Sequence, residues 1–215
     1  PMKRALIIAC STFFVVASCQ PPYHGPWAEA QAPTPTAEIK QAVGQVLGAL
    51  KEGAPSDALL LARIRKILEP QVDFEEMGRR VLGRHYAANQ SRMPEFIGLF
   101  QQLLERTYIQ RVWLEEGRSV TVSYQGERLE DGSTAMVRIK ITAAKGAEVQ
   151  VEFRLHRKSE RWLIYDILIE SMSLVSNYRT LFNRILLSKS FDELLLQMQK
   201  TIAQAKEVER QDRRR

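Results

Sequence analysis

Residues 162–179 read WLIYDILIESMSLVSNYR, a stretch that changes from a strand-like pattern to a helical one. Successive side chains of a strand point to opposite faces, so strict alternation predicts two faces that are both apolar. One face holds Trp162, Ile164 and Leu168, and the other holds Leu163, Tyr165, Ile167 and Ile169. Such a strand needs apolar cover on both sides, from two packed layers or from a core on one face and an apolar cavity on the other.

A helix is predicted directly after this strand, opened by Ser173 and carrying Leu174, Val175, Tyr178 and Phe182. Upstream, apolar and polar residues alternate around residues 120–124, 137–141 and 149–155. Short connections that are charged or contain glycine separate these segments, at residues 126–132, 145–146 and 158–161. With residues 162–170 they predict a four-stranded antiparallel meander.

Helical spacing surrounds the meander on both sides. Four helices are predicted before it, at residues 36–52, 56–69 and 73–83 and from residue 93 to about 113; two follow it, at residues 173–187 and 190–206. Asp73 with Glu76, and Ser190 with Glu193, have the three-residue spacing of helix N-terminal capping pairs. This order predicts an α+β fold, with helices packed on one face of a curved four-stranded antiparallel sheet.

Three blocks of sequence carry a resemblance to a known family. They are DFEEM at 73–77 with VLGRHY at 81–86, the helix containing Phe96, Phe100, Leu104 and Tyr108, and DILIE at 166–170 followed by SLV and NYR at 173–179. In this order, over residues 36–202, they closely resemble the MlaC family, also called the toluene-tolerance or ABC-transporter auxiliary family. The chain departs from the family pattern at Ser171 and at residues 188–190, where the family has glycine.

The resemblance implies that the helices and the curved sheet enclose an apolar pocket for phospholipid acyl chains. Aromatic, sulfur-containing and branched side chains are the candidates for its lining, although each would serve equally as ordinary core. They are Phe74, Met77, Phe96, Phe100, Tyr108, Phe153, Tyr165, Ile169, Val175, Tyr178 and Phe182. Asn177 and Arg179 are candidates for the head group at the pocket mouth; an ion pair with a helix-end carboxylate is the alternative for Arg179.

The resemblance also implies a role and a set of partners. A member of this family would carry phospholipid through the periplasm, without a cofactor and without catalysing a reaction. Its partners would be an outer-membrane complex of a lipoprotein and a porin, and an inner-membrane ABC transporter with its lipid-binding ring. A polycyclic lipid of the hopanoid type is an alternative ligand.

The residues themselves indicate little catalytic chemistry. His24, His85 and His156 lack metal-ligand spacing, and no glycine-rich phosphate loop or nucleophile motif occurs. We therefore predict no metal site, and the absence of a basic and aromatic platform argues against nucleic acid. Two alternatives stay open: a small-substrate enzyme on a related cone-shaped sheet, for which Asp166 is the only candidate acid, and a structural lipoprotein with a filled core.

The first 35 residues are predicted to direct export. Lys3 and Arg4 precede a short apolar run, so residues 1–18 form a signal peptide, and the proline-rich residues 19–35 form a leader or tether. The sequence VASC at 16–19 is a lipobox that would lipidate Cys19, while AEA at 28–30 is a competing site for ordinary signal peptidase. Residues 36–206 are the predicted domain and residues 207–215 a charged tail, which places the protein in the periplasm, either free or tethered to a membrane.

Overall fold

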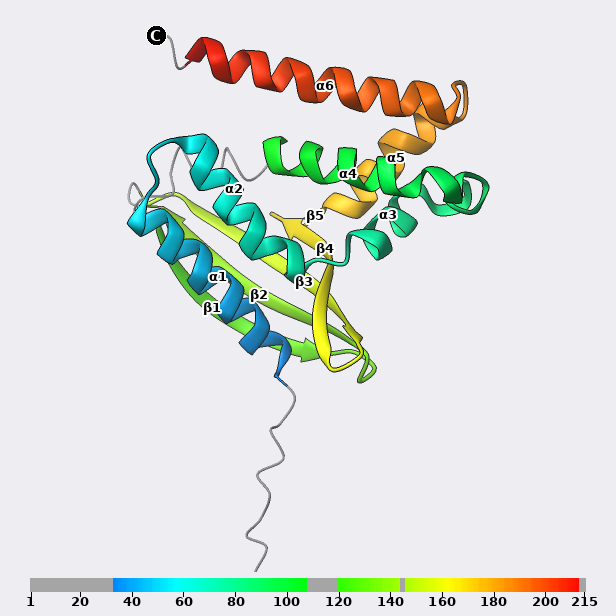
Figure 1. The fold of residues 1–215 in the computed structure, drawn as a ribbon. Coiled ribbons are helices and arrows are strands. Elements are labelled where there is room, and N and C mark those ends of the chain that lie inside the picture. Colours follow the sequence, from blue (N-terminus) through cyan, green and yellow to red (C-terminus); the bar gives the residue numbers. More distant parts are fainter. Residues whose placement is uncertain (1–32, 108–119, 144–145, 213–215) are drawn as a thin grey trace, which may run out of the picture. The chain divides into compact units, whose positions relative to one another are not determined.

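The computed structural model describes residues 33–107, 120–143 and 146–212. Its helices, with three short 3₁₀ turns between them, are α1 Pro35–Glu52, α2 Asp57–Leu68, η1 Glu69–Gln71, α3 Phe74–Leu82, η2 Gly83–His85, η3 Ala87–Arg92, α4 Met93–Leu104, α5 Leu174–Leu186 and α6 Phe191–Asp212. Its strands are β1 Val120–Leu129, β2 Thr134–Ala143, β3 Glu148–Lys158, β4 Arg161–Ile169 and β5 Met172–Ser173. The helices, the meander and the last helices follow one another in the predicted order (Figure 1).

The strands form one antiparallel sheet in the order β1-β2-β3-β4-β5. The predicted α+β class is confirmed, and the strand count differs by one, because the two residues of β5 pair with the end of β4. Helix α1 packs along β2 on the apolar face of the sheet. Ion pairs cross the opposite face, Arg138 with Glu152 at 2.8 Å and Lys140 with Glu148 at 2.9 Å, so only one face of these strands is covered by helices.

The strict alternation predicted along β4 is wrong, because the strand contains a β-bulge. Arg154 pairs with Asp166 while Leu155 pairs with Ile164, so Tyr165 is an extra residue without a partner on β3. A bulge of this kind shifts every later side chain to the other face of the sheet. As a result, Ile164 lies on the same apolar face as Ile167 and Ile169, which alternation had assigned to opposite faces.

Three apolar clusters hold the domain together. One lies between α1 and the sheet and contains Ile39, Val137 and Leu155. A small one joins α1 to α2 around Ile64. The largest joins α3, α4, α5 and α6 and has Phe96, Phe100, Phe182 and Leu194 at its centre. The helices are thus divided into two groups, α1 with α2 and α3 through α6, that share the sheet as a common floor.

Side-chain caps begin several helices where the sequence predicts them. The Ser173 hydroxyl accepts a hydrogen bond from the Ser176 N–H at 3.0 Å, and Ser190 and Glu193 exchange hydrogen bonds as a capping box. Helix α4 ends at Leu104, earlier than predicted, and a single π-helical turn continues to residue 107. The predicted continuation to residue 113 lies outside the described residues.

Asp73 ties α3 to the sheet. Its Oδ1 accepts from the Glu76 N–H at 3.0 Å, and its Oδ2 contacts Lys158 Nζ at 2.8 Å and His156 Nε2 at 3.2 Å. Burial raises the pKa of this carboxyl group, but the hydrogen bonds from Lys158 and from the Glu76 N–H outweigh burial and bring the pKa below its ordinary value of 3.8.

This network predicts the effect of Asp73→Asn on stability. The variant keeps a capping oxygen but loses the charge, so we expect the free energy of unfolding at neutral pH to fall by about 1–2 kcal/mol. Because the folded-state pKa is lowered, the contribution is complete above the unfolded-state pKa and disappears as the pH falls through the folded-state pKa. The free energies of unfolding from urea titrations of the two proteins should therefore differ at neutral pH and converge in strong acid. A difference that stays constant with pH would contradict a charged role for Asp73.

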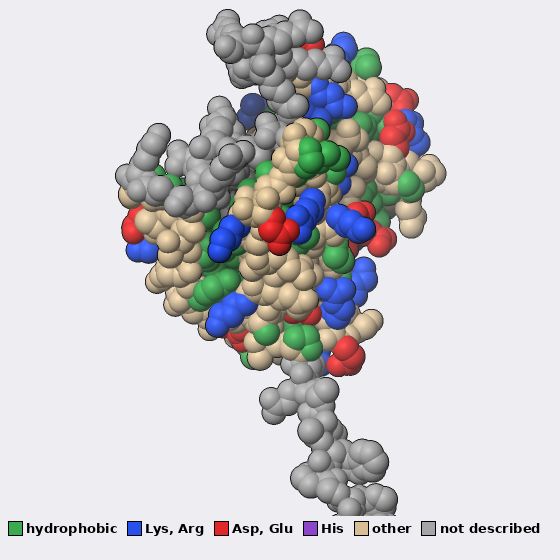
Figure 2. Space-filling model, turned by 60° about the vertical axis from the view of Figure 1, so that its left-hand side comes forward, with side chains coloured by type: hydrophobic (Ala, Val, Ile, Leu, Met, Phe, Trp, Pro, Cys, Tyr) green, Lys and Arg blue, Asp and Glu red, His purple; other side chains and the backbone are tan. Residues whose placement is uncertain are grey.

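Charges are interspersed over much of the surface. On the face shown in Figure 2, Lys and Arg side chains lie among acidic and apolar ones. Within the described part of the chain, no helix is long and apolar enough to span a membrane.

Candidate functional site

An apolar cavity of about 560 Å³ lies between the two groups of helices and the covered face of the sheet. Helix α1 closes one side, α3 and α4 close the other, and strands β2, β3 and β4 form the floor. Its apolar lining consists of Ile39, Ala42, Val43, Val46, Leu68, Val72, Phe74, Met77, Leu104, Ile139, Ile141, Val149, Val151, Phe153, Ile164, Ile167, Ile169 and Leu174. Small-molecule sites usually have volumes of roughly 300–1,000 Å³ and largely apolar walls, so this cavity is suited to a hydrophobic ligand.

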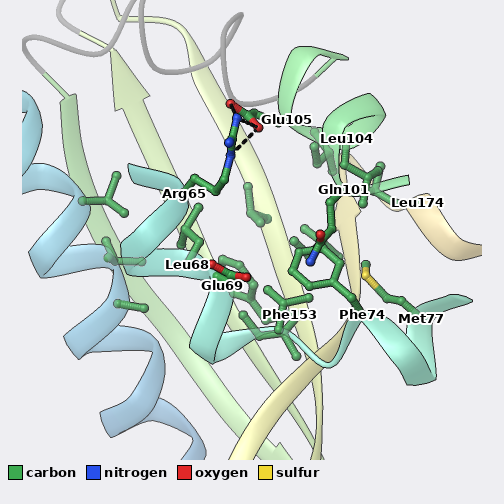
Figure 3. Close-up of a pocket in the computed structure, with 18 of the residues that line it drawn as sticks. Arg65, Leu68, Glu69, Phe74, Met77, Gln101, Leu104, Glu105, Phe153 and Leu174 are labelled. Carbon is green, nitrogen blue, oxygen red and sulfur yellow. Dashed lines mark hydrogen bonds and ion pairs between the residues drawn. The ribbon is translucent and has the colours of Figure 1, made fainter. Parts of the chain in front are cut away.

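Four of the residues predicted for the lining do line this cavity: Phe74, Met77, Phe153 and Ile169. Phe74 and Met77 project from α3, and Phe153 rises from β3 below them (Figure 3). The α1 residues that line the cavity were not among the predicted lining residues, although the apolar spacing of residues 39–46 is present in the sequence. That spacing predicts a buried helix face, but it does not distinguish a face that meets a core from one that meets a cavity.

The other aromatic candidates lie in the cluster of α3, α4, α5 and α6 and do not line the cavity. The ring centroids of Phe96 and Phe100 are 5.8 Å apart, and that of Phe100 is 5.2 Å from that of Tyr178. Phe182 packs against all three of these rings, and Val175 belongs to the same cluster. These side chains fix the helices that form one wall of the cavity.

Two further candidates have other positions. The ring of Tyr165, at the bulge, is covered by the guanidinium of Arg80 at 4.0 Å and by His156, so it lies outside the cavity lining. Tyr108 falls outside the described residues, as does Cys19.

The charged and amide groups of the described lining lie on α2, η1, the second half of α4 and the turn that follows it, whereas the lining from α1 and the sheet is apolar. They are Arg65, Glu69, Gln101, Gln102 and Glu105. Arg65 donates to both carboxylate oxygens of Glu105, at 2.8 and 2.7 Å, and this pair bridges the two helix groups (Figure 3). The hydrogen bond that Arg65 donates to Glu105 raises the pKa of Arg65, so the guanidinium stays charged. The cavity therefore has an apolar floor and an apolar α1 wall, and its polar groups are on the side of α2 and α4.

Asn177 and Arg179 are both exposed on α5 and do not line the cavity. The Arg179 guanidinium lies beside Gly83, with Nη2 3.3 Å from the position a Cβ would occupy there. Gly83 has φ = 53°, a conformation that favours glycine and ends α3. Arg179 instead belongs to a separate surface cleft with Arg79, Arg80, Tyr86 and Ala87.

Asp166 is buried, with 3% of its surface exposed, but it lies outside the cavity lining. It accepts hydrogen bonds from the Ser173 hydroxyl at 2.6 Å, the Ile167 N–H at 2.9 Å and the Val175 N–H at 3.1 Å. Arg154 Nη1 lies 3.7 Å from its Oδ2. Asp166 thus joins the end of β4 to the first turn of α5.

Asp166→Ala is therefore expected to be strongly destabilising. Three donors would lose their acceptor, and an unsatisfied buried donor costs about 1–3 kcal/mol, so we expect a loss of about 3 kcal/mol or more in the free energy of unfolding. Asp166→Asn keeps one acceptor oxygen and should lose less. Chemical denaturation of the two variants measures their free energies of unfolding. An Asp166→Ala protein as stable as the parent would contradict the structural role of Asp166.

No group of three or more metal-ligating side chains occurs within the residues that the structure describes. His85 contacts Asn183 Oδ1 at 3.2 Å and His156 contacts Asp73, so both rings are engaged in links between elements. His24 lies outside the described residues.

Comparison with known proteins identifies the family. The family model described as MlaC protein matches residues 40–200. The chain belongs to the MlaC family. A curated MlaC relative from Haemophilus influenzae, named an intermembrane phospholipid transport system binding protein, is 26% identical over 145 residues, which cover 66% of this chain and 67% of the relative.

A solved structure supports the MlaC fold. The phospholipid-binding protein of Ralstonia solanacearum, solved in complex with a phospholipid, superposes with a TM-score of 0.71 at 24% identity. The match covers 79% of this chain and 97% of that one. The predicted family resemblance and fold are both confirmed.

Proposed function

We propose that this protein is a phospholipid-binding carrier of an ABC-type system that moves lipid between membranes and maintains outer-membrane lipid asymmetry. The observation that carries the proposal is the cavity of about 560 Å³, whose floor and α1 wall are apolar and whose polar groups come from α2, η1 and the end of α4 with the turn after it. Membership of the MlaC family supports it, since the Haemophilus relative is named for this transport and the Ralstonia neighbour was solved with a phospholipid. Acyl chains would lie against the apolar sheet and α1, and the head group would lie on the side of α2 and α4, near Arg65 and Gln101.

The energetics of acyl chains favour a cavity over a surface patch. Transfer of a CH₂ group from water to an apolar site yields about 0.8 kcal/mol, so two chains of about fifteen carbons amount to on the order of 20 kcal/mol. A phospholipid therefore does not cross an aqueous compartment without a protein that covers its acyl chains. Because a bilayer and an apolar cavity offer similar environments to acyl chains, the free-energy change of moving a lipid from one to the other is close to zero. The direction of transport would therefore depend on partners.

We propose the periplasm as the compartment, with an inner-membrane ABC transporter and its lipid-binding ring as one partner and an outer-membrane lipoprotein and porin complex as the other. The proposed signal peptide is cut either before a lipidated Cys19 or after Ala30. Lipidation would tether the domain to one membrane by residues 19–35. Metabolic labelling with a fatty-acid probe tests this: label that is lost in Cys19→Ser supports the tether, and an unlabelled parent protein rules it out.

Lipid uptake tests the function directly. Delipidated protein mixed with vesicles of phosphatidylethanolamine and phosphatidylglycerol should acquire about one phospholipid per chain, and hopanoid-containing vesicles test the alternative ligand. A protein that acquires neither lipid would be inconsistent with a carrier.

The two alternatives fit less well. A structural lipoprotein with a filled core would not be expected to contain a cavity of about 560 Å³ beside a well-packed aromatic cluster. We propose a binding protein and not an enzyme, because Asp166, the acid considered for catalysis, is engaged with Ser173 and Val175 outside the cavity.

A further inference from the structure

A second hollow on the surface has a different chemistry from the apolar cavity. It is a cleft of about 420 Å³ lined by Arg79, Arg80, Gly83, Tyr86, Ala87 and Arg179. Helix α3 separates the two sites: Phe74 and Met77 project from it into the apolar cavity, whereas Arg79 and Arg80 line the cleft. We call this second hollow the arginine cleft.

The segments that form the arginine cleft are basic and lack acidic residues. Residues 77–92 contain four arginines and no Asp or Glu, and residues 171–191 contain Arg179, Arg184 and Lys189 and again no acid. These segments supply the end of α3, the turns that follow it, and α5. The charged residues within these two segments are therefore all basic, and the carboxylates that pair with them, such as Glu76 and Asp192, come from flanking residues.

One carboxylate serves two of the arginines. Glu76 accepts from Arg79 Nε and Nη2 and from Arg80 Nε, each at 2.7 Å, and the hydrogen bond from Arg79 is the main reason that the pKa of Glu76 is lowered. Two guanidinium charges thus share one negative charge. Glu76 holds both side chains in place and leaves an excess of one positive charge.

Arg179 adds a second excess charge. Among the described residues it forms no hydrogen bond or ion pair, yet its guanidinium is packed against Gly83 on the opposite wall. Arg84 also crosses to α5, where Nη2 donates to the neutral Asn183 Oδ1 at 3.2 Å. Three guanidinium groups, of Arg79, Arg80 and Arg179, therefore line the cleft with the single carboxylate of Glu76 between them, and Arg84 lies beside it.

We propose that the arginine cleft is an oxyanion site for a phosphate group, supplied either by an anionic lipid head group at a membrane surface or by free phosphate. A phosphate group has more acceptor oxygens than a carboxylate, so it can accept from Arg79, Arg80 and Arg179 together, and guanidinium forks match its geometry. The site is distinct from the apolar cavity, so it would orient the protein on a bilayer while the cavity takes up lipid.

The test compares Arg179→Gln and the double variant Arg79→Gln/Arg179→Gln with the parent chain. The matched control is Arg128→Gln, an exposed arginine of β1 that pairs with Glu130. Retention on phosphatidylethanolamine vesicles with and without phosphatidylglycerol is measured at low and physiological salt. We expect retention on the phosphatidylglycerol vesicles to fall about fivefold for each arginine removed from the cleft, and to be unchanged in the control.

A second readout uses inorganic phosphate and the Nε–Hε resonance of Arg179. A saturable shift of that resonance, with or without vesicle retention, supports an oxyanion site; vesicle retention that phosphate competes away assigns the head group as the source. Lipid taken into the cavity is quantified in the same samples and should not change in the variants. The proposal is overturned if neither phosphate nor vesicles distinguish Arg179→Gln from the control, or if the variants lose binding only to an acidic polypeptide.

Discussion

Gly98→Phe is expected to reduce the lipid bound per chain by about tenfold or more, without lowering the free energy of unfolding. Gly98 lies in the interior of α4 and lines the cavity, and a Cβ built there meets no heavy atom within 4 Å. A phenyl ring at this position would occupy space that the ligand needs, so binding of lipid beside it would overpack the cavity at a cost of about 1–3 kcal/mol in binding free energy. Because glycine disfavours a helix interior by about 0.5–1 kcal/mol, its replacement offsets any strain in the empty protein.

Gly44→Phe is the matched control. Gly44 also lies within a helix, α1, and a Cβ there also meets nothing within 4 Å, but Gly44 is exposed and does not line the cavity. Lipid per chain is measured by extraction and mass spectrometry, and stability by urea titration. If Gly98→Phe retained as much lipid as Gly44→Phe, the acyl chains would not occupy this cavity.

Phe100→Ala is expected to have the opposite signature, with a large loss of stability and little change in lipid bound by the folded fraction. Phe100 is 0% exposed and contacts the rings of Phe96, Tyr178 and Phe182. Truncation of a buried phenylalanine costs about 3–5 kcal/mol through lost burial and the cavity left behind. Since Phe100 does not line the ligand cavity, lipid per folded chain should change by less than about twofold.

Phe153→Ala is the comparison for this experiment. Phe153 lines the cavity and is only partly buried, so its removal should cost less stability and change lipid binding more than Phe100→Ala does. Denaturation and lipid extraction are run on both variants in parallel. Equal effects of the two variants on both measurements would mean that the aromatic cluster and the cavity act as one site.

The fold was largely predictable from the sequence because its signals are local. Ser56, Ser173 and Ser190 begin their helices as capping residues, and the alternating segments became β1 to β4. The bulge at Tyr165 was not predictable from alternation alone, since it follows from how β4 pairs with β3. One unpaired residue was enough to reassign the second half of the strand to the opposite face.

The site was harder to predict than the fold. Phe96, Phe100 and Phe182 carry the same apolar signal as Phe74 and Phe153, yet the first three fill a core and the last two face a cavity. Periodicity reports that a side chain avoids water, and not whether protein or ligand covers it. Arg179 was predicted at the mouth of the lipid pocket, but it lies in the arginine cleft, a position that depends on the approach of α5 to Gly83, which no sequence pattern reveals.

Native mass spectrometry of the protein purified without detergent tests the central claim most directly. The apolar cavity predicts an added mass of about one phospholipid per chain, which an organic extract identifies and which is lost in Gly98→Phe but kept in Gly44→Phe. A parent protein that carries no lipid, and acquires none from vesicles, would contradict the carrier function and leave the cavity without its proposed occupant.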